Sequence, residues 1–262
     1  MNSSSIQKRV AAAAGNTYFL YAPPHVTEAT RLFVTVHGWS RNAEEHATKF
    51  LALAERYGVV MIAPLFDSKN SPRYQQLGSS KGSLRADHIL DAVLAEVFDL
   101  TGVDPSPFGL FGFSGGGQFA HRYMMAHPER VSRLALGAPG WYTFPDPAQP
   151  FPRGTGEAAR LTGFSLEPWR FLQIPARVFV GENDTRQSHH LNTARGINRL
   201  QGLNRLERAE RWVKAMTAAA RACRYSTSYS LKLLPDSNHS FGRCMERGGM
   251  GEKVFGFLFD SV

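Results

Sequence analysis

The chain has 262 residues, of which 43% are hydrophobic and 20% charged, and its formal net charge is +8. These values are typical of a soluble globular protein, and they exclude collagen-like, coiled-coil and disordered chains. No apolar run approaches the roughly 18 residues of a membrane-spanning helix, so we expect neither a membrane protein nor a membrane partner.

Taken in chain order, the sequence begins with residues 1–15, which we expect to be a frayed start. Short apolar runs then alternate with amphipathic stretches, and the predicted strands are Asn16–Ala22, Arg31–His37, Val59–Pro64, Phe108–Phe113, Val131–Leu136, Ala176–Gly181 and Ser226–Leu234. The predicted helices between them are Ala43–Tyr57, Leu84–Leu100, Gly116–Ala126, Leu203–Ala222 and Gly251–Phe259. This alternation favours one α/β domain over residues 1–262, with a mostly parallel, doubly wound sheet flanked by helices.

Residues 141–170 interrupt the alternation. They are rich in proline, glycine and aromatic side chains, and they show no clear period. A connection of this length is usually functional, so we expect a cap-like insertion over a site. Trp141 and Tyr142 then either line a substrate pocket or pack the insertion on the sheet.

Positive charge is concentrated in residues 186–224. Nine lysines and arginines face two glutamates there, which leaves a net charge of +7. Arg205, Arg208 and Arg211 alternate with Glu207 and Glu210, which indicates either a solvated helix face with local ion pairs or a surface that binds an anionic partner. We expect no nucleic-acid partner, and the oligomeric state is left open.

The compartment is only partly indicated. The short apolar run after Lys8-Arg9 does not reach the length of a signal-peptide core, so we expect a cytoplasmic protein unless a leader was removed. Cys223 and Cys244 are too few for a metal cage, and they form either one disulfide or two free thiols.

A G-x-S-x-G pattern occurs at residues 112–116, between a predicted strand and a predicted helix. Gly112 and Gly116 let backbones pass closely at such a tight turn, and Ser114 is exposed at its tip. Ser114 is therefore the candidate nucleophile.

A serine hydroxyl needs a base, and His239 is the best placed of the nine histidines. It follows the last predicted strand at its carboxyl end, where ligands gather in open α/β sheets. His37 also ends a strand, but we expect it to hold its own loop in shape. Adjacent His189 and His190 do not suit a metal site, and we expect no metal and no cofactor.

The base needs an orienting carboxylate. Asp184 lies just past a predicted strand end and is the preferred candidate, with Asp236 and Glu182 as competitors. For an oxyanion, the N–H of Gly115 supplies one donor, and the loop after the second predicted strand supplies another from the N–H of Trp39.

With these residues in the order Ser114, Asp184, His239, and a His-Gly loop upstream, the chain resembles the α/β-hydrolase superfamily over nearly its whole length. The stretch His37-Gly38-Trp39-Ser40-Arg41-Asn42 is similar to the poly(3-hydroxybutyrate) depolymerase-like and feruloyl-esterase-like branch. The resemblance implies a Ser-His-Asp carboxylic ester hydrolase without a cofactor. Many members of that branch have cysteine where this chain has Trp39.

Three functions follow from these patterns. The first is a serine esterase for soluble short-chain or aryl esters or polyester oligomers, with Trp39, Trp141 and Tyr142 against the substrate. The second is a hydrolase of a polyanionic polymer or poly(amino acid) bound through residues 186–224. The third is a basic binding module on a catalytically silent scaffold, which the reactivity of Ser114 distinguishes from the other two.

Overall fold

The computed structural model describes residues 5–78, 84–159, 163–187 and 191–260. One sheet of eight strands runs through the described chain in the order β1-β2-β4-β3-β5-β6-β7-β8. Its strands are β1 (Gln7–Val10), β2 (Thr17–Tyr21), β3 (Leu32–Val36), β4 (Val60–Pro64), β5 (Phe108–Phe113), β6 (Val131–Gly137), β7 (Ala176–Gly181) and β8 (Tyr229–Leu234). Neighbouring strands from β4 through β8 pair in parallel, and β1 and β2 form an antiparallel edge, so the predicted mostly parallel sheet is confirmed.

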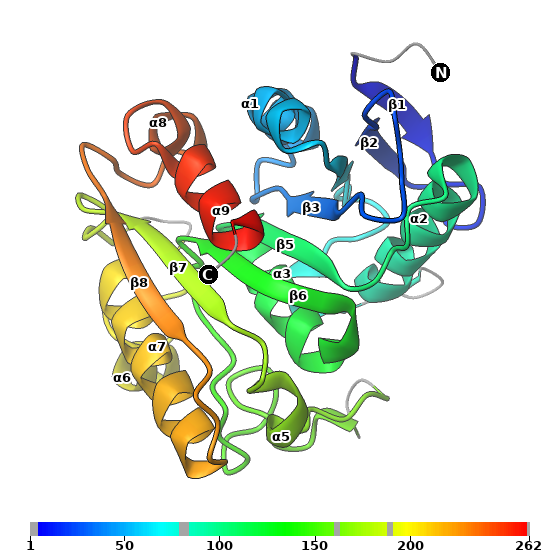
Figure 1. Ribbon diagram of the computed structural model, residues 1–262. Coiled ribbons are helices and arrows are strands. Elements are labelled where there is room, and N and C mark those ends of the chain that lie inside the picture. Colours follow the sequence, from blue (N-terminus) through cyan, green and yellow to red (C-terminus); the bar gives the residue numbers. More distant parts are fainter. Residues whose placement is uncertain (1–4, 79–83, 160–162, 188–190, 261–262) are drawn as a thin grey trace.

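Helices cover both faces of this sheet (Figure 1). They are α1 (Ala43–Tyr57), α2 (Ala86–Thr101), α3 (Gly115–Ala126), α5 (Pro168–Phe171), α6 (Arg195–Gln201), α7 (Arg205–Ala222), α8 (Phe241–Glu246) and α9 (Met250–Phe259), with short 3₁₀ turns η1 (Tyr74–Gln76) and η2 (Pro128–Arg130). One core cluster lies between the sheet and α2, α3 and α7, and a second lies between the sheet and α1, α8 and α9. Among the described helices, none combines the length and apolar character that a bilayer crossing requires.

The expectation of a frayed N-terminus is wrong for residues 7–10. They form strand β1, in which Gln7 lies opposite Leu20 and Val10 opposite Thr17. Side chains of this strand are alternately half-buried and exposed, as at a sheet edge. Arg9 donates to the Tyr18 hydroxyl over 3.1 Å, which anchors the edge strand to its neighbour.

The described part of segment 141–170 packs into the interior. Tyr142, Phe144, Phe151, Phe164 and Leu166 belong to the core cluster shared with α2, α3 and α7. These buried side chains anchor the segment to the domain, whereas Trp169 is 58% exposed.

Candidate active site

Ser114 lies at the turn between β5 and α3. Its φ is +53° and its ψ −111°, a strained conformation for a residue other than glycine. The turn is tight because a Cβ on Gly112 would lie 2.2 Å from the carbonyl oxygen of Gly116, and one on Gly116 would lie 2.0 Å from that of Val36. Only glycine fits at these two positions, and the close packing holds the serine hydroxyl out at the tip.

The loops after β7 and β8 are tied together beside that turn. Asn183 donates its N–H to the carbonyl of Ser237 over 2.9 Å, and Glu182 donates to that of Leu234 over 3.1 Å. A Cβ on Gly181 would collide with the Ser237 carbonyl, so the two loops approach as closely as backbones can. These contacts bring Asp184 and His239 next to each other.

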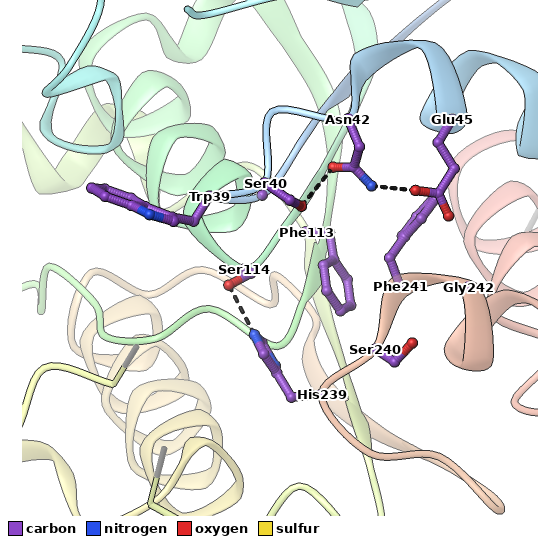
Figure 2. Close-up of a pocket in the computed structure, with 11 residues that line it drawn as sticks. Trp39, Ser40, Asn42, Glu45, Phe113, Ser114, His239, Ser240, Phe241 and Gly242 are labelled. Carbon is purple, nitrogen blue, oxygen red and sulfur yellow. Dashed lines mark hydrogen bonds between the residues drawn. The ribbon is translucent and has the colours of Figure 1, made fainter. Parts of the chain in front are cut away.

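Ser114, His239 and Asp184 form one hydrogen-bonded row. His239 Nε2 lies 2.9 Å from Ser114 Oγ, and His239 Nδ1 lies 2.8 Å from Asp184 Oδ2 (Figure 2 shows the first of these contacts). An ionised carboxylate only accepts hydrogen bonds, so Nδ1 carries the proton and Nε2 is left to accept from the serine hydroxyl. The ring of Phe113 stacks on the imidazole with centroids 5.3 Å apart and holds its orientation.

The two competing carboxylates belong to exposed residues. Glu182 accepts a hydrogen bond from the backbone N–H of Asp236 over 2.8 Å, and both residues are exposed. Asp184, by contrast, is only 3% exposed and faces His239. Of the three candidate carboxylates, Asp184, which the sequence favoured, is therefore the one hydrogen-bonded to His239.

The loop of Trp39 runs beside the start of α3. A Cβ placed on Gly115 would lie 3.5 Å from the backbone nitrogen of Trp39 and 2.7 Å from the hydroxyl of Tyr74. Gly115 is the first residue of α3, where helix N–H groups have no partner within the helix. The two predicted oxyanion donors are therefore neighbours next to Ser114.

The prediction that His37 holds its loop is confirmed. The side chain is fully buried, its Nδ1 donates to the Gly38 carbonyl over 2.7 Å, and its Nε2 accepts from the N–H of Phe66 over 2.9 Å. Burial lowers the pKa of His37 to about 4, so the ring is neutral at neutral pH. Tyr74, from a 3₁₀ turn that the sequence did not reveal, donates its hydroxyl to the His37 carbonyl over 3.0 Å.

Ser114 and His239 open onto a pocket of about 570 Å³ (Figure 2). Phe113 and Phe241 form an aromatic side of the pocket, and Trp39, which is 59% exposed, lies at its rim. A polar side is formed by Ser40, Asn42 and Glu45, in which Ser40 donates to Asn42 and Asn42 donates to Glu45. Glu45 is the charged side chain among the described lining residues.

The expectation that Trp141 and Tyr142 contact substrate is corrected by their burial. Tyr142 is fully buried and stacks on Trp212 with centroids 5.1 Å apart. Trp141 is 8% exposed, and the Arg122 guanidinium covers its ring at 4.3 Å. Neither lines the pocket, and neither does any other described residue of the segment 141–170.

The basic segment also differs from expectation, because two of its arginines are interior. Arg205 and Arg208 are at most 1% exposed. Arg208 donates to the carbonyls of Gly202, Gly140 and Asn192, whereas Arg205 donates to Asp184 Oδ1 over 3.2 Å. A spacing signal for this burial exists in the sequence: both arginines fall on the buried stripe of α7 that continues through Ala209, Trp212, Met216 and Ala220.

The histidine, cysteine and acidic side chains form neither a metal cluster nor a disulfide within the described residues. Within the described residues, no group of three or more histidine, cysteine or acidic side chains could hold a metal ion. His189 and His190 lie outside the described residues. Cys223 and Cys244 are both free thiols, and burial raises the pKa of Cys244 to about 12.

A mostly parallel sheet with helices on both faces, a strained serine turn after β5, and an acid and a histidine after β7 and β8 together define the α/β-hydrolase fold. Solved structures with this fold cover nearly the whole chain. No protein-family model matches the chain, and comparison with curated protein sequences gives no match.

Three of the similar structures illustrate the range. Poly(aspartic acid) hydrolase-1 from Sphingomonas sp. KT-1 is 24% identical, with a TM-score of 0.80 over 98% of this chain and 99% of that one. The poly(3-hydroxybutyrate) depolymerase LpqC from Bordetella parapertussis is 23% identical, with a TM-score of 0.77 over 97% and 90%. An S-formylglutathione hydrolase from Agrobacterium tumefaciens is 13% identical, with a TM-score of 0.61 over 97% and 94%.

Proposed function

We propose that this protein is a serine hydrolase that cleaves carboxylic esters through an acyl-enzyme intermediate. The observation that carries the proposal is the hydrogen-bonded row of Ser114, His239 and Asp184 at a pocket. A nucleophile within reach of a base, with the base oriented by a third group, is the arrangement that covalent catalysis by serine requires.

Acylation begins when Ser114 Oγ attacks the ester carbonyl and its proton moves to His239 Nε2. The backbone N–H groups of Gly115 and Trp39 donate hydrogen bonds to the oxyanion of the tetrahedral intermediate. Asp184 stabilises the imidazolium and keeps the imidazole in the required tautomer. The intermediate collapses, and the leaving alcohol takes the proton from Nε2.

Deacylation repeats these steps with water. His239 removes a proton from a water molecule, which attacks the acyl-serine carbonyl, and the same two N–H groups stabilise the second oxyanion. Collapse releases the carboxylic acid and returns the proton to Ser114 Oγ. No cofactor takes part in either half of this mechanism.

We assign the substrate to uncharged esters with a short acyl chain or an aryl group, or to oligomers of a polyester. Phe113 and Phe241 offer apolar surface beside the serine, and Trp39 at the rim offers an exposed indole ring. The described lining includes the carboxylate of Glu45 and no lysine or arginine, which favours an uncharged substrate over an anionic one.

The test is hydrolysis of p-nitrophenyl esters from acetate to palmitate by the wild-type protein and by Ser114→Ala. We expect activity that is highest on short chains, and we expect Ser114→Ala to retain less than about a hundredth of it, because losing a nucleophile costs several orders of magnitude. A folded Ser114→Ala variant with near wild-type activity would remove Ser114 from the mechanism.

A second candidate is the hydrolysis of a polyanionic poly(amino acid) by the same three residues. Two observations favour it: the similarity to a poly(aspartic acid) hydrolase over nearly the full length of both chains, and the net charge of +8. Because Arg205 and Arg208 are buried, such a substrate would meet the exposed basic side chains of the segment, which are Arg186, Arg195, Arg199, Arg211, Lys214, Arg221 and Arg224.

The two candidates differ in the bond that is cleaved, an ester or an amide, and in how strongly the cleavage rate depends on salt concentration. Incubation with poly(aspartic acid), followed by measuring newly formed amino groups at low and high salt, tests the second candidate directly. Serine-dependent cleavage that falls as salt rises would support it, because screening weakens attraction between a basic surface and a polyanion. If the protein cleaves esters but not poly(aspartic acid), only the first candidate remains.

A further inference from the structure

The carboxylate of Asp184 has a different partner on each oxygen. Oδ2 accepts from His239 Nδ1 over 2.8 Å, and Oδ1 accepts from the Arg205 guanidinium over 3.2 Å. Asp184 is 3% exposed and Arg205 is 1% exposed, so the ion pair is sheltered from solvent. Sheltered charges interact much more strongly than charges at the surface, and they are stable only when paired.

Arg205 is held in place by its own helix. It is the first residue of α7, and the side chain of Asn204 caps this helix by accepting the N–H of Glu207 over 2.9 Å. One turn further on, Arg208 is fixed by backbone carbonyls. The guanidinium of Arg205 is thus directed at Asp184 by a rigid element, and its burial keeps it from a ligand in solution.

We propose that Arg205 is a positioning residue of the active site, which acts on His239 through Asp184. It holds the plane of the carboxylate so that Oδ2 meets Nδ1, and its positive charge offsets part of the negative charge that the imidazole experiences. This inference rests on the proposed function of Ser114, His239 and Asp184. It also gives Arg205 a role within the protein in place of substrate binding.

The charge effect has a direction that a pH profile can detect. Asp184 is faced by His239 after β8 and by Arg205 on α7, with Tyr142 after β6 and Cys244 on α8 also within electrostatic range. Without the guanidinium, the carboxylate attracts a proton on His239 more strongly. His239 then stays protonated to higher pH, and the acid limb of kcat/KM moves up by about one pH unit.

The experiment compares Arg205→Met, Arg205→Lys and wild type by kcat/KM on p-nitrophenyl acetate across pH. For Arg205→Met we expect the shifted acid limb and a loss of roughly 10- to 100-fold in kcat, because a carboxylate without its anchor orients the base poorly. Arg205→Lys retains the charge but not the guanidinium geometry, so its acid limb stays near that of wild type while kcat falls. Arg208→Met is the matched control, since it removes a buried guanidinium of the same helix that does not contact Asp184, and its acid limb should not move.

A double-mutant cycle separates this role from a purely structural one. If Arg205 acts through Asp184, its replacement costs almost nothing further in kcat/KM once Asp184→Asn is present. Equal losses in both backgrounds, or an unshifted acid limb in Arg205→Met, would overturn the proposal. If Arg205→Met does not fold, Arg205→Lys replaces it in the cycle. The proposal then requires that Arg205→Lys lowers kcat/KM when Asp184 is present and has almost no further effect when Asp184→Asn is present. If the wild-type protein shows no activity that depends on Ser114, the proposed function itself is rejected. This outcome is distinct from a failure of the Arg205 proposal alone.

Discussion

At the scale of single residues, the geometry of the site depends on two glycines, Gly112 and Gly116, which have no Cβ atom. Hydrogens in place of Cβ atoms at Gly112 and Gly116 let β5, the loop after β3 and α3 approach within van der Waals distance. The contacts that a side chain would meet there are backbone atoms, which cannot move aside independently. Ser114 takes its strained conformation only because this packing leaves the backbone no alternative.

Gly116→Ala should therefore be severely destabilising. The added methyl group would lie 2.0 Å from the carbonyl oxygen of Val36 and 2.5 Å from that of His37, and we expect a loss of about 3 kcal/mol or more in the free energy of unfolding. Urea denaturation measures this. Gly242→Ala is the control, because its methyl group would meet Glu45 at an ordinary 3.6 Å, and its stability should stay near wild type. A Gly116→Ala variant as stable as wild type would contradict the account of this turn.

At the scale of elements, the sequence predicts most of the framework because the central strands are apolar on both faces and the helices have a clear period. Helix Ala43–Tyr57 and strands Phe108–Phe113 and Ala176–Gly181 agree with prediction at both ends. The elements that escaped prediction are short: η1, η2, α5, α6 and α8 have three to seven residues, too few for a hydrophobic period to appear. Strand β1 was not predicted because it is stabilised by pairing with β2, and the hydrophobic pattern of residues 7–10 alone does not indicate this contact.

The start of α7 offers a test at this scale. Asn204→Ala removes a side-chain acceptor from the N–H of Glu207, and we expect it to lower the free energy of unfolding by about 1 kcal/mol. Asn204→Ser keeps an acceptor oxygen and places no negative charge beside Glu207, whose Oε1 accepts from Asn204 Nδ2 over 2.7 Å, so it should remain close to wild type. Thermal unfolding of the three proteins checks this, and equal midpoints for Asn204→Ala and wild type would show that the cap contributes little.

At the scale of the whole molecule, the predicted serine, acid and histidine come together because each follows a strand and parallel strands end at one edge of the sheet. Pairings that join distant segments escaped prediction. The Asp184–Arg205 ion pair and the packing of Tyr142 on Trp212 are examples. Residue type and local spacing indicated either a solvated helix face or a binding surface for Arg205, and either a pocket or packing on the sheet for Tyr142. Such contacts depend on how α7 packs on the sheet, which no single segment specifies.

The interior also contains three fully buried histidines, His37, His46 and His121, and burial lowers the pKa of each. The unfolded chain, in which a histidine has a pKa near 6.5, binds more protons than the folded chain between pH 6.5 and the lowered values, so stability falls as pH falls through that range. For His37, with a folded pKa of about 4, the expected loss between pH 7 and pH 5 is about 2 kcal/mol. Urea denaturation at both pH values measures the sum, and equal stabilities would contradict neutral burial of these rings.

The long separation of Ser114 from His239 along the chain, 125 residues, has a consequence for biosynthesis. A ribosome completes the serine turn well before it adds the histidine, so the nascent chain carries an ordinary alcohol throughout that interval. The Ser114 hydroxyl can meet the His239 imidazole only once β8, which precedes the histidine in the chain, is in place in the sheet. A product truncated before β8 therefore contains Ser114 without the His239 imidazole that it meets in the folded chain.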